Sequence, residues 1–397
     1  MFSERCFLYM LLSYYEGIME VEKAKRIVNI FHNPITAWVV LFISIILTLA
    51  AYFVSDKIVV ERAEKEFEFR VNEISKAVTD RLTVYEQVLW GGVAYIKASE
   101  TFPKRSEWKT YVDQLKLKTY WPGIQGVGFS LLVEPKDVSR IETSVQAEGF
   151  KEFKIWPNGT RDLFTTILYL EPFDWRNRRA FGYDMWSNEA RRVAMARAKE
   201  FGIASMSGII TLVQETEQDV QRGFLTYVPV YKGNRKDVLG WVYAPFRAND
   251  LMSGILGSDD PNIEFEIFDG TAMSEETLLF KTTDQTHLKN TQFQPVFSVS
   301  KKLELQGRTW SLYFHTPKTF KIKGENQPKA VVMIGLIIDL LLFYIIYSLS
   351  VIQQRAEKLA VEMTTSLRTE NEELNSKCDA QAFEIDQLKM KLSKDSS

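Results

Sequence analysis

Two long apolar runs constrain this chain more than any other feature of its sequence. The first, ITAWVVLFISIILTLAAYFV at 35–54, has no charged residue, and the second, AVVMIGLIIDLLLFYIIYSLS at 330–350, has Asp339 as its one charge. A helix of about 20 apolar residues crosses the roughly 30 Å hydrocarbon core of a bilayer. We therefore expect two transmembrane helices. The alternatives are buried core helices and, for the first run, a cleaved signal peptide, which the run's length disfavours.

Charges beside the two runs predict the orientation. Basic residues stand on the sides away from the intervening segment: Lys23, Lys25, Arg26, Arg355 and Lys358. Because positively charged flanks stay in the cytoplasm, we expect residues 1–34 and 351–397 to be cytoplasmic. Lysines just before the second run weaken the signal, although long segments cross largely regardless of charge. The prediction is a multi-pass protein of the cell inner membrane, with residues 55–329 in the periplasm.

Composition narrows the possible chemistry. The formal net charge is −2, which gives no reason to expect nucleic-acid binding. The two cysteines lie near opposite ends and the three histidines are far apart, so we expect no metal site. We find no phosphate-binding loop, nucleophile elbow or kinase motif. We therefore predict no catalytic residues, no metal and no cofactor.

The segment between the runs begins with an amphipathic helix over 57–102. Apolar residues recur there at steps of three and four: Phe67, Val71, Ile74, Val78, Leu82, Tyr85 and Val88. A second helix is expected to start at Ser106. Runs rich in β-branched and aromatic residues then predict strands at 124–133, 164–170, 209–214, 223–232, 239–246, 263–269, 278–282 and 299–316. Short helices between them predict an α+β fold with two mixed sheets in sequence.

The end of the chain carries a heptad pattern. The predicted a positions are Asn371, Cys378, Ile385 and Leu392, and the d positions are Leu367, Leu374, Gln381 and Leu388. Such a seam is typical of a coiled coil, and an asparagine at a favours a parallel homodimer. The alternative is a single solvated helix. No output motif follows, so the output is expected either from a separate protein or from a part missing from this sequence.

The stretch AFGYDMWSNEARRVAMARAKEFG at 180–202 is the candidate site. Asp184 stands among aromatic residues just before a predicted helix. Ser187 is the expected N-cap, with Glu189 in the first turn. The expected buried face is Ala190, Val193, Ala194, Ala198 and Phe201. Capping would thus leave Asp184 free to accept a hydrogen bond from a ring N–H, between apolar walls that include Tyr183 and Trp186. The alternative is that Asp184 merely begins the helix.

From YLEPFDWRNRRAFGYDMWSNEARRVAMARAKEFGIASMSGIITLVQET through GFLTYVPVY, with WPGIQGVGFS before it, the chain resembles the CHASE domain. This is an extracytoplasmic sensor of cytokinin receptors and bacterial signalling proteins. The resemblance covers about 90–316. It implies a long helix followed by two PAS-like modules, here a distal module at about 124–231 and a proximal module at about 232–316. The distal module would hold the ligand.

The resemblance also implies ligand-binding residues. In the cytokinin receptors the aspartate of the DM motif binds the adenine moiety, and that position is Asp184. A backbone group after the following helix corresponds to Met206, and threonine contacts fall near Thr211 or Thr216. Trp186 and the loop VQETEQD depart from the plant pattern, which puts an adenine-type ligand in doubt.

These inferences predict a dimeric membrane sensor. It would bind a small molecule, possibly of adenine or cytokinin type, and transmit a conformational signal to a cytoplasmic output. One alternative is a structural membrane adaptor that binds protein partners and no small molecule. Another is an enzyme acting through the segment between the two runs.

Overall fold

The computed structural model describes residues 34–215, 220–233, 237–257, 260, 262–283 and 293–394. Its contacts group the chain into two compact units. One unit is Arg62–Lys321, which we call the sensor unit. The other, which we call the helix unit, consists of the segments before and after it.

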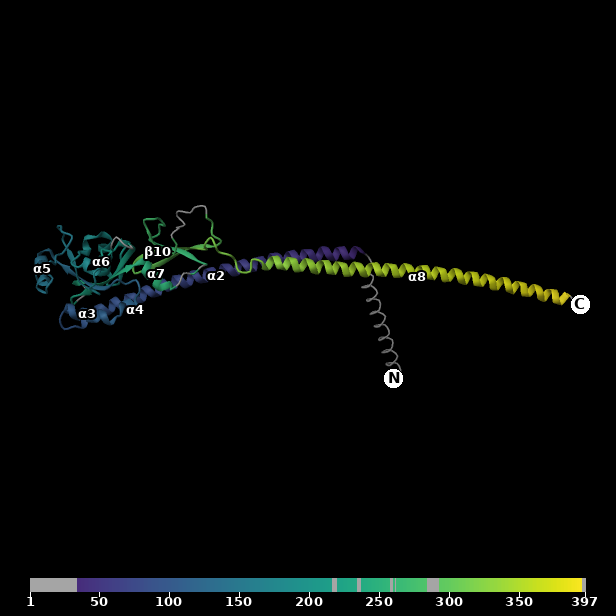
Figure 1. The fold of residues 1–397 in the computed structure, drawn as a ribbon, viewed down its shortest axis with the longest axis horizontal. Helices are drawn as coiled ribbons and strands as arrows, with labels where there is room; N and C mark the ends of the chain where they lie inside the picture. The colour runs from purple at the N-terminus through teal and green to yellow at the C-terminus, as the bar shows by residue number, and fades with distance from the viewer. Residues whose placement is uncertain are drawn as a thin grey trace, which may run out of the picture. The chain divides into compact units, whose positions relative to one another are not determined.

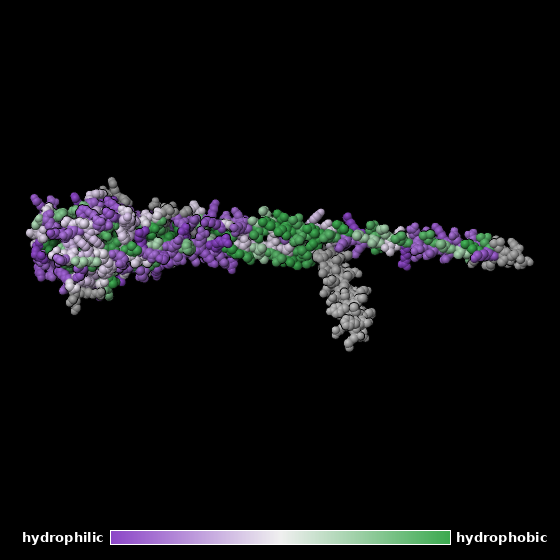
Figure 2. Space-filling model, turned by 90° about the horizontal axis from the view of Figure 1, so that it is seen from below, coloured by the Kyte–Doolittle hydropathy of each residue, from purple (hydrophilic) through white to green (hydrophobic). Residues whose placement is uncertain are grey.

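The helix unit contains parts of two long helices, α2 (Pro34–Ala98) and α8 (Gln327–Lys394). Each is long and apolar enough to cross a membrane. Their apolar segments lie side by side, and hydrophobic side chains cover this part of the surface (Figure 2). Both predicted apolar helices are therefore present.

Asp339, the one charge in the second apolar run, lies between these two helices. Its side chain is buried, and Oδ2 accepts a hydrogen bond from the Thr48 hydroxyl at 3.0 Å. Nearby, the rings of Trp38 and Phe343 meet edge to face with centroids 4.9 Å apart. Asp339 thus has a packing partner within the same chain.

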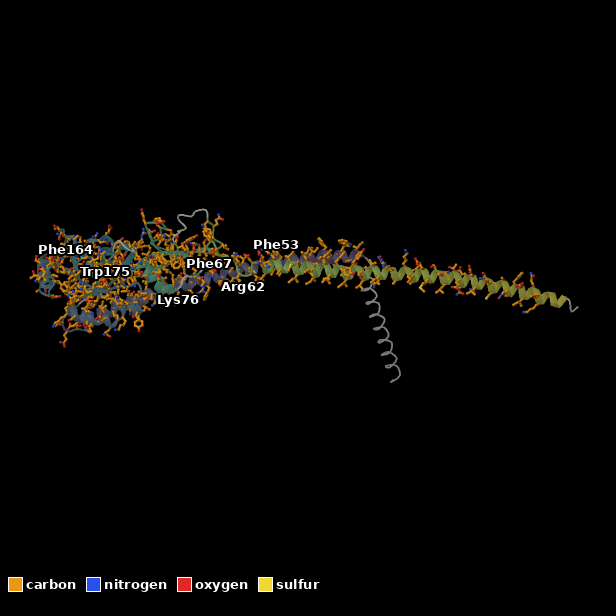
Figure 3. The ribbon with its side chains drawn as sticks, viewed as in Figure 1. Phe53, Arg62, Phe67, Lys76, Phe164 and Trp175 are labelled. Atoms are coloured by element: carbon orange, nitrogen blue, oxygen red, sulfur yellow. The ribbon has the colours of Figure 1, made fainter. Side chains whose placement is uncertain are left out.

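In the sensor unit, α2 runs along one side of both sheets (Figure 1). The three- and four-residue spacing predicted this buried stripe, and the prediction is confirmed: all seven predicted positions are buried or packed against the core. Phe67 belongs to the stripe, whereas Lys76 is exposed (both labelled in Figure 3). The α2 helix therefore packs against the core of both sheets of the sensor unit.

The larger sheet is antiparallel, with the order β2–β1–β6–β5–β3 and with β4 also paired to β5. Its strands are β1 (Val127–Val133), β2 (Phe164–Glu171), β3 (Ser205–Met206), β4 (Ile210–Thr211), β5 (Arg222–Tyr231) and β6 (Val238–Arg247). The predicted division between modules near residue 231 is wrong, because β6 lies in this sheet between β1 and β5. The cause is a long antiparallel ladder from Gly223↔Arg247 to Tyr231↔Val238, which holds β5 and β6 together.

The smaller sheet has the antiparallel order β8–β7–β10–β9. Its strands are β7 (Glu264–Asp269), β8 (Leu278–Lys281), β9 (Ser298–Leu305) and β10 (Arg308–His315). The turn between β9 and β10 contains Gln306 and Gly307, both with positive φ. This turn reaches the elements of the larger sheet, as described below.

Short helices connect the strands. They are α3 (Arg105–Gln114), α4 (Leu117–Tyr120), η1 (Pro135–Asp137), α5 (Val138–Ala147), η2 (Asn177–Ala180), η3 (Met185–Ser187), α6 (Glu189–Phe201) and α7 (Ala248–Leu256). The second predicted helix begins at Arg105, where the Glu107 carboxylate accepts a hydrogen bond from the Lys104 N–H at 2.7 Å. The α+β fold with a long N-terminal helix is confirmed. The PAS-like modules and the coiled coil stay predictions.

Candidate functional site

The two faces of the larger sheet have different neighbours. Val228 and Val242 belong to the core that the sheet shares with α2. Tyr227 and Trp241 belong to a second cluster, formed with η3 and α6, and we call the sheet face beneath α6 the outer face. Trp241 Nε1 donates to the carbonyl oxygen of Met195 at 3.0 Å, which fixes α6 on that face.

Asp184 is fully buried beside β2, and both of its carboxylate oxygens have partners. Oδ1 accepts from the N–H and hydroxyl of Thr165, at 2.8 and 3.0 Å, and from the N–H of Trp186 at 3.0 Å. Oδ2 accepts from Nε of Arg161 at 2.9 Å. Burial raises the pKa of the Asp184 carboxyl, and the bonds from Thr165 and the charge of Arg161 oppose that rise.

Two expectations about the start of α6 are wrong. Asp184 is not left free by capping, because it is itself the N-cap of η3 through Trp186 N. The N-cap of α6 is Asn188, whose side chain accepts from Arg191 N at 3.1 Å. The Ser187 hydroxyl instead donates to the Asp184 carbonyl oxygen at 2.6 Å. The η3 turn comes between Asp184 and the helix, so the cap falls one residue later than predicted.

The buried face of α6 also differs from the prediction. Ala194 and Ala198 are buried as expected, but Val193 and Phe201 are 58% and 59% exposed. The remaining buried positions are Arg191 and Met195. Because α6 is rich in alanine and arginine, its sequence is compatible with burial of either side of the helix. Packing against the outer face of the sheet determines which side is buried.

The aromatic neighbours of Asp184 are partly buried. The rings of Tyr183 and Trp156 meet edge to face, with their centroids 4.8 Å apart. The Arg191 guanidinium also lies 4.8 Å from the centroid of the Tyr183 ring. The Trp186 ring packs near Trp241 at 5.9 Å. The role of Tyr183 and Trp186 as walls of a ligand site stays a prediction.

The other predicted contact residues lie at the opposite edge of the larger sheet. Met206 is buried in β3, and its N–H donates to the carbonyl oxygen of Gln306 at 2.9 Å. Thr211 is exposed in β4, paired with Arg222. Thr216 lies outside the described residues. The structure thus brings Tyr183, Asp184 and Trp186 together and places Met206 and Thr211 across the sheet from them.

Between these two edges, the outer face carries polar atoms that the sequence analysis missed. Tyr243, Tyr227 and Ser205 are register neighbours on β6, β5 and β3. Their hydroxyl groups are buried without a hydrogen-bond partner among the described residues, as is Nε of Arg191 on α6. One signal was available: Arg191 stands at helical spacing from Ala194 and Ala198, on the buried face of an amphipathic helix.

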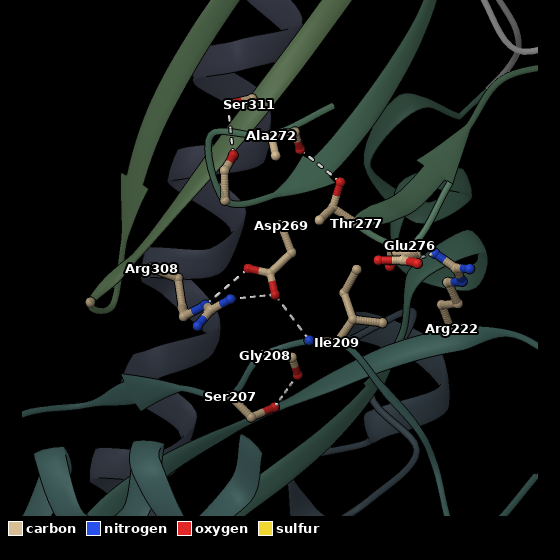
Figure 4. Close-up of polar contacts among 12 residues, drawn as sticks. Ser207, Gly208, Ile209, Arg222, Asp269, Ala272, Glu276, Thr277, Arg308 and Ser311 are labelled. Atoms are coloured by element: carbon tan, nitrogen blue, oxygen red, sulfur yellow. Dashed lines mark hydrogen bonds and ion pairs between the residues drawn. The ribbon is translucent and has the colours of Figure 1, made fainter. Parts of the chain in front are cut away.

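A polar cluster joins the two sheets (Figure 4). Asp269 lies at the end of β7, and its carboxylate accepts a hydrogen bond from Arg308 Nε at 2.9 Å. It accepts a second hydrogen bond from Nη2 of the same arginine. Its Oδ2 accepts from Ile209 N at 3.0 Å, and Ile209 precedes β4. From β5, Arg222 donates to the carbonyl oxygens of Glu275 and Glu276, at 2.7 and 3.1 Å. The smaller sheet is therefore bonded to the strands that follow α6.

Two cavities lie away from Asp184. One, of about 680 Å³, lies beside the smaller sheet and is lined by residues that include Arg70, Ile74 and Phe265. The other, of about 470 Å³, lies in the helix unit around Thr48 and Asp339. Within the described ranges, no group of three or more His, Cys, Asp and Glu residues is placed to hold a metal ion.

Comparison with protein families gives one match in this region: residues 103–280 match the CHASE domain. The resemblance to the CHASE domain seen in the sequence is therefore confirmed over these residues. Among curated proteins, none matches the chain.

Solved structures of sensor domains are also similar. An extracellular ligand-binding receptor from Desulfohalobium retbaense shares 10% identity at a TM-score of 0.39; the match covers 63% of this chain and 40% of that one. The ligand-binding domain of the Pseudomonas aeruginosa amino-acid chemoreceptor PctC, in complex with GABA, shares 12% identity at 0.37, covering 64% and 100%. The periplasmic sensory domain of the Campylobacter jejuni chemoreceptor Tlp1 shares 9% at 0.39, covering 64% and 92%.

Proposed function

Because residues 103–280 form a CHASE domain, we propose that this chain is a membrane-anchored sensor that binds a small molecule outside the cytoplasm. The observation that carries the proposal is the position of this domain between two helices that are each able to cross a membrane. The function is sensing rather than catalysis. The proposed location is the cell inner membrane, with the sensor unit in the periplasm and both ends of the chain in the cytoplasm.

The proposed ligand site is the outer face of the larger sheet, beneath η3 and α6. A planar nitrogenous ligand, such as an adenine-type compound, would reach Asp184 by replacing Arg161 at Oδ2. The Arg161 side chain is 21% exposed, so it can move aside, whereas the donors to Oδ1 are two buried groups of Thr165 and the Trp186 main chain.

We propose that the turn between β9 and β10 carries the signal to α2. Gln306 accepts from Met206 N in β3, and the Gly307 carbonyl oxygen accepts from Arg197 in α6. The Gln306 side chain donates to the Leu82 carbonyl oxygen and to Glu86 Oε2 of α2, both at 3.3 Å. A ligand that displaces α6 or β3 would therefore move a turn that is bonded to α2. A ligand shifts such an equilibrium only by its differential affinity for the two states.

The cytoplasmic end of α8 is proposed to pair with a second copy of the chain as a parallel coiled coil. Leu367, Leu374 and Leu388 are separated by seven and fourteen residues and are 63%, 56% and 56% exposed. A stripe of exposed leucines on a long helix is stabilised when a partner helix covers it. The dimer would relay the signal to a separate or additional output protein.

Topology is the first test. Asp184 is too buried to accept a thiol reagent in a folded protein, so the labelling position is Trp175, which is 63% exposed. In intact cells, a membrane-impermeant thiol reagent should label Trp175→Cys and should not label Cys378. Labelling of Cys378 alone would contradict the proposed orientation.

Ligand binding is the second test. The full chain in nanodiscs would be screened by thermal shift against a metabolite panel that contains purines, carboxylates and sugars. A ligand that binds only the folded state stabilises it by RT ln(1 + [L]/Kd). Saturable stabilisation without turnover supports a sensor. Absence of any binding, together with capture of a defined protein partner, would favour a structural adaptor, and turnover of a bound compound would favour an enzyme.

A further inference from the structure

This inference rests on the sensor function proposed above. We propose that the ligand carries a carboxylate, and that the guanidinium of Arg191 binds it together with the hydroxyl groups of Tyr227 and Tyr243. These groups lie beneath α6 on the outer face of the larger sheet, between Asp184 at one edge and Met206 at the other.

Arg191 is a buried cation without a counter-charge. It is 4% exposed, its Nε has no hydrogen-bond partner, and its side chain forms no ion pair within the described residues. Its guanidinium lies over the face of the Tyr183 ring, in a cation–π contact. Arg247, which is equally buried, shows the usual alternative: its Nε lies 2.9 Å from Glu215 Oε1. Burying a charge is costly unless it is paired, so the Arg191 guanidinium is poised to receive an anion.

Hydroxyl donors accompany this cation. Tyr227 and Tyr243 are both 0% exposed, and neither hydroxyl has a hydrogen-bond partner within the part of the chain that the structure describes. Other buried tyrosines of the unit are bonded: Tyr85 donates to the Pro122 carbonyl oxygen at 2.7 Å. Buried polar groups are nearly always hydrogen-bonded, and an exception calls for an explanation such as strain, a functional role or a bound ion. Two such exceptions in register on adjacent strands are therefore informative.

The protonation state suits an acceptor ligand. Burial raises the pKa of Tyr227 and of Tyr243, and the charge of Arg191 acts on both hydroxyls in the opposite direction. Both groups therefore remain protonated at physiological pH and can donate. Ser205, the register neighbour of Tyr227, adds another buried hydroxyl without a partner. The outer face of the sheet thus offers hydroxyl donors around one positive charge.

The charge balance selects a carboxylate over a phosphate. Without ligand, the site supplies one cation, Arg191, because Arg161 is paired with Asp184 and a carboxylate held by Arg191 leaves that pair in place. A carboxylate carries one negative charge and matches the planar guanidinium fork. A phosphate monoester carries about −1.5 to −2 at neutral pH and would leave excess charge buried. Carboxylates of any source, free amino acids among them, share the required chemistry.

The main experiment measures binding to the full chain in nanodiscs by titration calorimetry. The probes are acetate, benzoate, succinate and the free amino acids, each compared with its neutral amide. At least one carboxylate should bind, and its amide should bind at least about tenfold more weakly. Arg191→Gln should weaken that carboxylate at least about tenfold, which corresponds to about 1.4 kcal/mol. The matched control is Lys199→Gln, which removes one exposed positive charge from the same helix and should bind as the wild type does.

A stability comparison guards against misfolded variants. Tyr227→Phe removes a hydroxyl that has no partner, so the ligand-free melting temperature should stay unchanged or rise. Tyr85→Phe removes a bonded hydroxyl and should lower it. If Tyr227→Phe lowers the melting temperature as much as Tyr85→Phe does, the Tyr227 hydroxyl is internally bonded and the inference fails.

The remaining outcomes separate this inference from the proposed function. If none of the carboxylates binds, or if the one that binds does so equally well to Arg191→Gln, the carboxylate site is wrong. If a neutral ring compound binds and depends on Asp184 but not on Arg191, the sensor function stands and the carboxylate inference fails. If no compound of any class binds, both fail.

Discussion

Replacing Asp184 with alanine should destabilise the sensor unit, even before any ligand is considered. The substitution removes both carboxylate oxygens and leaves their donors without an acceptor. Trp186 N–H retains a partner, because it also donates to the Thr165 hydroxyl at 3.1 Å. Three donors lose their acceptor at this site: the buried N–H and hydroxyl of Thr165 and the Nε of Arg161.

The magnitude follows from these three donors. An unsatisfied buried donor costs about 1–3 kcal/mol. The Thr165 N–H takes this cost in full, since Thr165 is 0% exposed. Arg161 is 21% exposed and can turn to water, so its share is discounted. The expected loss is about 2–4 kcal/mol. Asp184→Asn keeps an acceptor at Oδ1 and should cost less than Asp184→Ala.

The assay is urea unfolding of the full chain in detergent, followed by tryptophan fluorescence, because Trp156 and Trp186 lie next to the substituted position. The control is Asp174→Ala. Asp174 also lies in the connection after β2 and accepts main-chain hydrogen bonds from Arg176 and Asn177, but it forms no recorded ion pair. A midpoint for Asp184→Ala equal to that of the wild type would refute the reasoning. Asp184 would then be free of these contacts, as a purely ligand-binding carboxylate would be.

Four further predictions concern pH, the turn, the membrane helices and the dimer. Burial raises the pKa of Asp184, so its protonated form favours folding. The free energy of unfolding of the wild type, relative to that of Asp184→Asn, should therefore fall as pH rises from below 3.8 through the raised pKa. A rise across that window would show that the ion pair dominates. Gln306→Ala should preserve ligand affinity but reduce the ligand's effect on the rate at which Cys378 forms an intermolecular disulfide; an undiminished effect would exclude the turn as the coupling element. Asp339→Ala should weaken helix packing by about 0.6–1.7 kcal/mol, because it removes the hydrogen bond from Thr48. The loss would be measured by unfolding in nanodiscs, with Asp339→Asn as the conservative control. Equal stability of the two variants would argue against that bond. Oxidation should link two copies through Cys378, as expected for an a position of a parallel coil, and a strictly monomeric product would count against the dimer.

Local patterns in the sequence predicted much of the fold. The two apolar runs predicted the apolar helices because about 20 predominantly apolar residues are enough for a helix to cross a bilayer. The stripe from Phe67 to Val88 predicted the buried face of α2, since spacing of three and four residues follows directly from helix geometry. Runs of β-branched and aromatic residues predicted most strands. Each of these signals depends only on neighbours along the chain.

The sequence was less decisive where several residues could fill one role. Asp184, Ser187 and Asn188 are all good N-cap residues, and all lie within five residues of the start of α6. Propensity cannot choose among them, because the choice depends on Thr165 of β2, which bonds Asp184 and leaves Asn188 to cap the helix. In the same way, only pairing with β1 and β5 assigned β6 to the larger sheet.

The sequence by itself determined which segments are apolar helices, which are strands, and that a CHASE-like stretch lies between them. Only the tertiary structure decided which polar groups are already bonded and which are not. Asp184, conspicuous in the sequence, proved to be bonded to Arg161 and Thr165. In contrast, Nε of Arg191 and the hydroxyl of Tyr227 proved to be buried without a hydrogen-bond partner among the described residues. The physical reason is that a hydrogen bond is satisfied by atoms close in space, and these atoms come from strands and helices far apart in the chain.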